Sequence, residues 1–135
     1  MRTIEFRGKR VDNGEWVYGY VDVMMYNGMA VIHTETGTFG VNQETVGQYT
    51  GYNDDEGQEI FEGDIIRYQY EDRDAYTGWH GLREVTDEVV FEYSSFRLKN
   101  TYPFNIDSLW DMDNPKVEVI GNIHDNPELM KGGEE

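Results

Sequence analysis

Residues 45–67 read TVGQYTGYNDDEGQEIFEGDIIR, and this stretch decides the fold class. Glycines flank Tyr49 on both sides, so the chain can bend around an aromatic anchor, which we expect to pack between two halves of the protein. Segment 53–57, Asn-Asp-Asp-Glu-Gly, predicts a turn, because Asn and Asp side chains bond to nearby backbone and glycine tolerates a positive φ.

A second turn follows at Glu62-Gly63-Asp64, where we expect Asp64 to cap the entry into a strand. Ile65 to Tyr70 is rich in β-branched and aromatic residues and predicts that strand. Two closely spaced turns, each feeding a short strand, are typical of a small barrel or roll.

The residues before this stretch predict an antiparallel meander. Asp12-Asn13-Gly14 and Tyr26-Asn27-Gly28 are hairpin signals. They separate short runs with strand composition, which we place at 3–8, 15–23, 29–34 and 38–41.

The run at 15–23 is apolar on both faces, with Trp16, Tyr18 and Tyr20 alternating with valines and Gly19. A strand that is apolar on both faces is usually covered on both sides, so we expect the aromatic row to be core. The alternative is a stacking platform for a ligand.

The residues after the stretch are less regular. Glu71 to Asp87 is polar, and we interpret it as a long loop carrying Trp79 as a candidate contact residue, since long loops are often functional. Further strands are expected at 88–93, 96–99 and 117–123, with Ser94-Ser95 as a tight joint. Short helical turns are expected at 106–110 and 126–129, and a disordered tail at 131–135.

The composition fits a folded domain that works in a reducing compartment. The chain has 135 residues, of which 38% are hydrophobic and 14% aromatic, so it is too apolar for a disordered protein. It has no cysteine, which excludes disulfides and thiolate metal sites. No window suggests a signal peptide or a bilayer span, and we expect a cytoplasmic protein.

The net charge is −16, and it is unevenly distributed. Residues 1–10 hold four cations and one acid, so the remainder is more acidic still. Such acidity keeps a protein soluble and repels nucleic acid and anionic membranes. It also allows a second interpretation, an acidic surface that mimics nucleic acid and binds a basic protein.

The sequence shows no pattern typical of an enzyme or a cofactor site. His33, His80 and His124 lie at no metal-ligand spacing, and the acidic turn near Gly57 fails the calcium-loop template. No serine stands in a nucleophile motif. Paired carboxylates cannot be singled out among 27 acids. We therefore expect a non-enzymatic protein without metal or cofactor.

The basic block Arg7, Lys9 and Arg10 is the candidate interaction site near the start of the chain. It allows three interpretations: solvated charges at a strand end, a contact with an acidic neighbouring copy, or a modest phosphate footprint.

Five sequence blocks together resemble the YopX family of phage and prophage proteins. They occur in the family's order and are FRGKR at 6–10, NGEWVYGY at 13–20, TVGQYTG at 45–51, GQEIFEGDII at 57–66 and VIGNIHDNPEL at 119–129. The resemblance implies a small, mostly β phage protein with an SH3-like barrel in its C-terminal half and no established activity. It implies the host cytoplasm as the compartment.

The combined prediction is an all-β protein with two subdomains. Residues 1–56 form the antiparallel meander, and residues 57–130 form the SH3-like barrel with the long inserted loop 71–87. Trp16, Tyr18, Tyr49, Gly63 and Asp64 are the expected structural anchors. We expect an interaction protein that associates with itself, since a small meander leaves edge strands to cover. We expect any other partner to be a host protein rather than nucleic acid or membrane.

Overall fold

The computed structural model describes residues 5–24, 29–101 and 105–130. These residues are nearly all β, which confirms the fold class. They divide into two compact units, Met1–Gly51 and Tyr52–Glu135. None of the helices described is long and apolar enough to cross a membrane. The strands are β1 Phe6–Lys9, β2 Trp16–Met24, β3 Met29–Thr34, β4 Gly37–Asn42, β5 Gly47–Asn53, β6 Glu59–Phe61, β7 Asp64–Arg73, β8 His80–Glu92, β9 Ser95–Leu98 and β10 Asp113–Asn122, with 3₁₀ helices η1 Gln43–Thr45, η2 Ile106–Asp111 and η3 Pro127–Met130.

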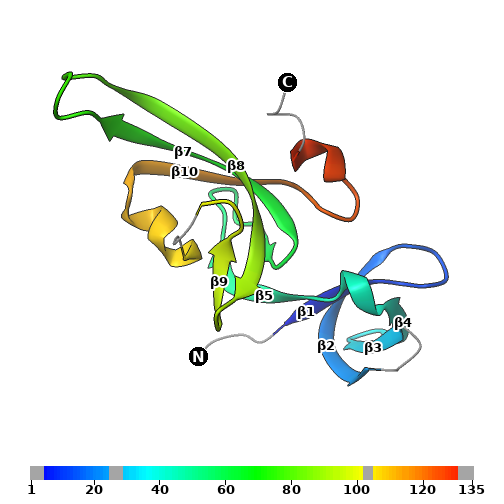
Figure 1. The fold of residues 1–135 in the computed structure, drawn as a ribbon. Coiled ribbons are helices and arrows are strands. Elements are labelled where there is room, and N and C mark those ends of the chain that lie inside the picture. Colours follow the sequence, from blue (N-terminus) through cyan, green and yellow to red (C-terminus); the bar gives the residue numbers. More distant parts are fainter. Residues whose placement is uncertain (1–4, 25–28, 102–104, 131–135) are drawn as a thin grey trace. The chain divides into compact units, whose positions relative to one another are not determined.

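The first unit is the predicted antiparallel meander, closed by one further strand. Its strands lie in the order β4-β3-β2-β1-β5 (Figure 1). The expected turn before β2 is present, since Lys9 pairs with Trp16 and Gly14 has a φ of 75°. A side chain at Gly19 would collide with the carbonyl of His33, so only glycine allows β2 and β3 to lie this close. The fully buried core residues are Ala30, Ile32 and Val41.

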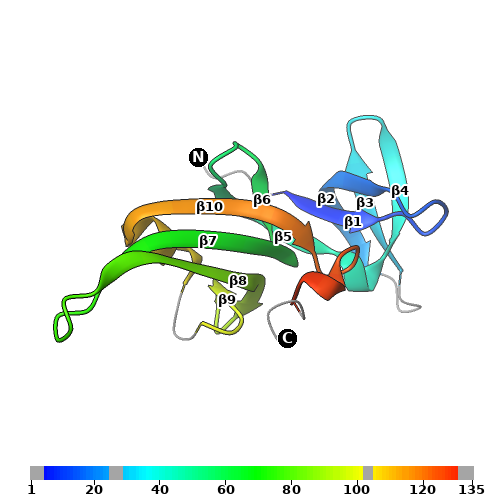
Figure 2. The same cartoon turned by 90° about the horizontal axis from the view of Figure 1, so that it is seen from above.

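The second unit contains a four-stranded antiparallel sheet in the order β10-β7-β8-β9. One face of this sheet carries the larger core, because alternate residues of each strand point to it. Figure 2 shows β10, β7 and β8 running side by side along most of their length. The buried cluster consists of Ile60, Ile66, Tyr68, Val89, Leu98, Ile106, Leu109 and Val117.

The two turns of the opening stretch form as expected. Gly57 and Gly63 have φ values of 86° and 95°. Asp64 is buried, and its carboxylate accepts a hydrogen bond from the N–H of Phe61 at 2.7 Å, which closes the second turn. Tyr49 lies in β5, and its N–H donates to the carbonyl of Glu5 at 2.7 Å. Its role as an anchor between the two halves stays a prediction.

The expected loop at 71–87 is wrong. β7 continues to Arg73 and β8 begins at His80, so most of the segment belongs to the two strands of a long hairpin. Register is continuous from Ile65 opposite Glu88 to Arg73 opposite His80. Only residues 74–79 form the turn. The joint expected at Ser94-Ser95 is shifted by one residue, since Tyr93 and Ser94 have positive φ and β9 begins at Ser95.

The remaining expectations concern the ends and borders of the units. The helical turns are present as η2 and η3. The two units separate at Gly51, whereas the sequence suggested a border after residue 56. The SH3-like barrel stays a prediction. The expected hairpin signal at Tyr26-Asn27-Gly28 and the tail at 131–135 lie outside the described residues.

Candidate functional site

The outer half of the β7–β8 hairpin, residues 71–82, is the most exposed regular structure among the described residues, and we call it the arm. In both views its tip projects beyond the rest of the second unit (Figures 1 and 2). It carries large apolar side chains in solvent: Tyr76 is 99% exposed and Leu82 is 63% exposed. Exposed apolar groups on a projecting element mark interaction surfaces.

The tip of the arm is an ordered turn. The carboxylate of Asp74 accepts hydrogen bonds from the N–H groups of Tyr76 at 2.8 Å and Thr77 at 3.3 Å. These two bonds lower the pKa of Asp74 below its ordinary value. The N–H of Gly78 donates to the carbonyl of Asp74, and Gly78 has a φ of 76°. The turn therefore presents Tyr76 from a defined backbone.

Trp79, the contact residue expected from the sequence, lies on the arm and is 42% exposed. Its ring lies so close to Gly81 that a Cβ there would be 2.9 Å from Cζ2. The guanidinium of Arg83 lies 4.5 Å from the ring centroid and is 3.0 Å from the carboxylate of Asp72. These contacts hold the indole in place while leaving much of it in solvent.

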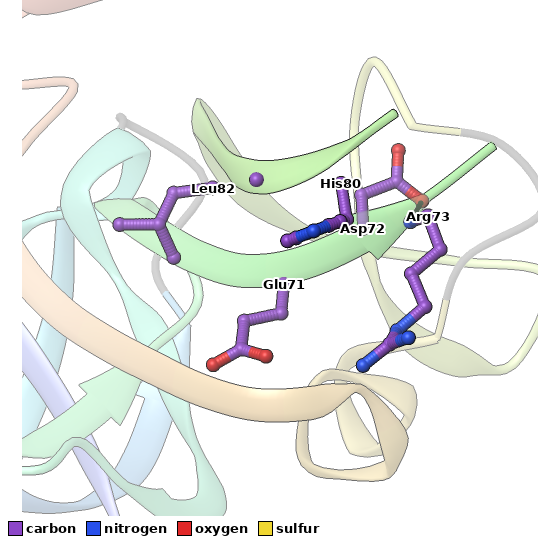
Figure 3. Close-up of a pocket in the computed structure, with 6 residues that line it drawn as sticks. Glu71, Asp72, Arg73, His80 and Leu82 are labelled. Atoms are coloured by element: carbon purple, nitrogen blue, oxygen red, sulfur yellow. Dashed lines mark hydrogen bonds between the residues drawn. The ribbon is translucent and has the colours of Figure 1, made fainter. Parts of the chain in front are cut away.

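A hollow of about 380 Å³ lies on the arm and is lined by Glu71, Asp72, Arg73, His80, Gly81 and Leu82. Figure 3 shows Glu71 and Arg73 pointing to the same side of β7, as alternate residues of a strand do. Most of the lining side chains are exposed. Small-molecule sites enclose most of their ligand between apolar walls, so this open, charged hollow fits a contact surface better.

The basic block is largely engaged within its own unit. Arg7 is only 5% exposed, and its guanidinium lies 4.6 Å from the ring centroid of Trp16, which Lys9 also approaches at 5.7 Å. Arg10 is 2.7 Å from the carboxylate of Asp12, and their hydrogen bond lowers the pKa of Asp12. The role of this block in a contact between copies stays a prediction, with less cationic surface available to support it.

The expectation that the aromatic row of β2 is core is wrong for two of its members. Tyr18 and Tyr20 are 45% and 58% exposed, because only the opposite face of β2 packs on the small core. Trp16 is half-buried. Tyr20 instead stacks on His33 with ring centroids 5.3 Å apart.

His33 also joins a hydrogen-bonded relay that the sequence did not reveal. Its Nε2 is 2.9 Å from the carboxylate of Asp22, and its Nδ1 is 2.9 Å from the hydroxyl of Thr38. An acid, a base and a hydroxyl in line resemble an activated nucleophile. Here Thr38 and Asp22 are exposed, and a relay that is open to solvent activates a hydroxyl poorly because catalytic sites exclude water. We interpret the relay as a cross-strand polar contact.

The buried carboxylates of the second unit serve the fold. Asp54 accepts hydrogen bonds from the N–H groups of Glu56, Gln58 and Val119 at 2.8–2.9 Å. Asp87 is fully buried and accepts from both nitrogens of Asn100 and from the hydroxyl of Thr101. Among the described residues no three His, Asp or Glu side chains gather as metal ligands.

Negative charge is concentrated in the second unit. Residues 1–51 hold four Lys and Arg against six Asp and Glu, a net charge of −2. Residues 52–135 hold seven against 21, a net charge of −14. Cations still interrupt the outer face of the sheet, where Arg67 is 2.9 Å from Glu118 and 4.0 Å from Glu84.

Comparison with known proteins identifies the family. The profile of the YopX protein family matches residues 5–131, nearly the whole chain. The chain belongs to the YopX family. The match confirms the resemblance drawn from the five sequence blocks.

A crystal structure with a similar fold is that of protein EF1440 from Enterococcus faecalis. The two chains are 22% identical, the TM-score is 0.57, and the alignment covers 96% of this chain and 99% of that chain. At this identity the likeness shows the fold alone. No curated protein matches the chain.

Proposed function

We propose that this YopX protein is a non-enzymatic interaction protein that associates with itself through the arm. The observation that carries the proposal is the arm itself: an ordered hairpin that places Tyr76, Trp79 and Leu82 in solvent. Projecting hairpins with open strand edges and exposed apolar side chains tend to associate with another chain, which covers them.

The contrast with the other polar groups supports a non-enzymatic role. Asp54, Asp64 and Asp87 are buried and bind backbone or neighbouring side chains, so they are acceptors that hold the fold. Because the family resemblance implies a phage protein, the proposal includes the host cytoplasm as the compartment in which the protein acts.

Analytical ultracentrifugation at tens of micromolar tests the proposal. We expect a mass above the 15.8 kDa of one chain. A control variant shortens the hairpin by joining Asp72 to Gly81 through a two-residue Asn-Gly turn, because these residues are directly paired. This variant should keep the circular dichroism of the wild type and sediment as a monomer. A wild type that is monomeric at these concentrations would overturn the proposal.

The charge of the second unit favours a second candidate function, an acidic decoy that occupies a DNA-binding host or defence protein. Its support is the net charge of −14 on residues 52–135. A pull-down from host lysate distinguishes it, because an electrostatic partner is lost at high salt. Retention of the same partner at 1 M salt, about a 3 Å screening length, would count against the decoy.

A further inference from the structure

The outer edge of β8 is open along the arm. β9 pairs with β8 only from Val89 to Glu92, and β7 occupies the other edge along the whole hairpin. From His80 to Thr86, none of the described strands pairs with the edge that faces away from β7. This edge offers a row of backbone groups to an additional strand.

The direction of these backbone groups follows from the neighbouring hydrogen bonds. The carbonyl of Glu88 accepts from the N–H of Lys99, which lies beyond the outer edge of β8, whereas the carbonyl of Val89 accepts from Gly63, on the β7 side. Alternate residues of an antiparallel strand direct their N–H and C=O to the same neighbour. His80, Leu82, Glu84 and Thr86 therefore present theirs to the open edge.

We infer that this edge pairs with β8 of a second copy, antiparallel about a two-fold axis centred on Leu82. The inference rests on the proposed self-association and names its register. A two-fold axis normal to the sheet pairs residues on the same face of the two strands. Leu82 then lies opposite Leu82, and His80 lies opposite Glu84 on each side of the axis.

Charge and exposure select this register. Centring the axis on Arg83 would set two arginines opposite each other, and centring it on Glu84 would set two glutamates opposite each other, which is unfavourable in either case. Centring it on Leu82 covers a side chain that is 63% exposed and forms two polar pairs between His80 and Glu84. On the other face, Gly81 lies opposite Arg83 of the second copy, so this register sets no like charges opposite each other on that face.

Cysteine cross-linking tests the register, because the chain has no cysteine of its own. With a short bifunctional maleimide, Leu82→Cys should give a covalent dimer in high yield. Glu84→Cys is the matched control on the same strand and face. In the proposed register the two Glu84 positions lie about 13 Å apart along the strands, so this variant should cross-link poorly.

Charge reversal provides an independent test. His80→Glu sets glutamates opposite each other and should weaken association about tenfold over the two symmetric pairs. Adding Glu84→Lys should restore most of the affinity, since the new carboxylate at position 80 of each copy would then face an ammonium group at position 84 of the other. A double variant as weak as the single one would overturn the register.

The outcomes separate the inference from the proposed function. A wild type that sediments only as a monomer overturns both. A wild type that associates, with cross-linking at Glu84→Cys but none at Leu82→Cys, overturns the register and leaves self-association through the arm standing. Cross-linking at Leu82→Cys alone, with rescue by the double variant, is the expected result.

Discussion

The inner half of the β7–β8 hairpin, residues 64–70 and 83–92, packs on the larger core, whereas no residue of the arm is buried. The same two strands run through both halves in unbroken register. In the inner half Ile66, Tyr68 and Val89 are buried, and in the arm Leu82 and Tyr76 are largely exposed. The backbone pairing is therefore common to both halves, and what differs is the packing of the side chains.

This difference predicts that substitutions in the inner half change the stability of the fold, whereas substitutions in the arm change self-association. A two-stranded hairpin alone is marginally stable in water, so the arm depends on the inner half for its order. The inner half does not depend on the arm in the same way. Matched substitutions in the two halves test this asymmetry.

The largest contrast is expected between two aliphatic truncations. Ile66→Ala leaves a cavity in the core and should lower the free energy of unfolding by about 2–5 kcal/mol. Leu82→Ala removes an exposed side chain and should change it by less than about 0.5 kcal/mol. Urea unfolding at low protein concentration measures both without the contribution of association.

Equal losses in the two variants would show that the arm is part of the core structure. At high concentration Leu82→Ala should instead weaken self-association in sedimentation experiments, where Ile66→Ala should act only through the folded fraction.

Two carboxylates on the hairpin give the next contrast. Asp87 accepts hydrogen bonds from Asn100 and Thr101 in a fully buried site. Asp87→Ala leaves these donors without an acceptor and should lower the free energy of unfolding by about 3 kcal/mol. Asp72 is 38% exposed and pairs with Arg83 at the surface, so Asp72→Ala should cost about 0–1 kcal/mol. Denaturant midpoints of the two variants, measured side by side, check the order. A costlier Asp72→Ala would contradict it.

The sequence predicted the turns and the inner strands because their physics is local. Gly57 and Gly63 adopt the positive φ that their positions required, and Ile65 to Tyr70 form a strand. The arm was missed because strands exposed on both faces leave no apolar alternation, so residues 71–87 resemble a polar loop. The opposite error occurred in β2, where apolar residues on both faces suggested burial but Tyr18 and Tyr20 are exposed. The relay around His33 depends on the register of β2, β3 and β4, which no local pattern encodes.

A smaller effect is expected at Glu88, near the junction with β9. Its side chain is 12% exposed, and burial raises its pKa above the ordinary value despite Lys99 at 3.6 Å. The folded state then holds a proton that the unfolded state has lost, so stability falls as pH rises through this window. Glu88→Gln removes the titration. The free energy of unfolding of Glu88→Gln, relative to that of the wild type, should therefore increase from pH 4 to pH 7, by less than about 1 kcal/mol.

Urea midpoints across this pH range measure the difference. A difference between Glu88→Gln and the wild type that is constant with pH would show that Glu88 titrates alike in the folded and unfolded chains. A difference that grows toward low pH would show that the ion pair with Lys99 outweighs burial.

The smallest effect is expected at the tip of the arm, where the turn at Asp74 should be sensitive to acid. Its pKa is lowered because the carboxylate accepts hydrogen bonds from Tyr76 and Thr77. The stabilisation is therefore present above the ordinary pKa near 3.8 and is lost as pH falls through the lower, folded-state value.

Because the site is exposed and distant from the core, the loss should be local. The amide signals of Tyr76 and Thr77 should shift toward unfolded positions in an NMR titration below pH 4, while signals of buried residues such as Val89 stay fixed. Asp74→Ala should show the shifted signals at neutral pH with an unchanged unfolding midpoint. Amide signals that stay constant down to pH 2 would mean that the turn is held by its backbone bonds alone, and the arm would then be more rigid than its exposure implies.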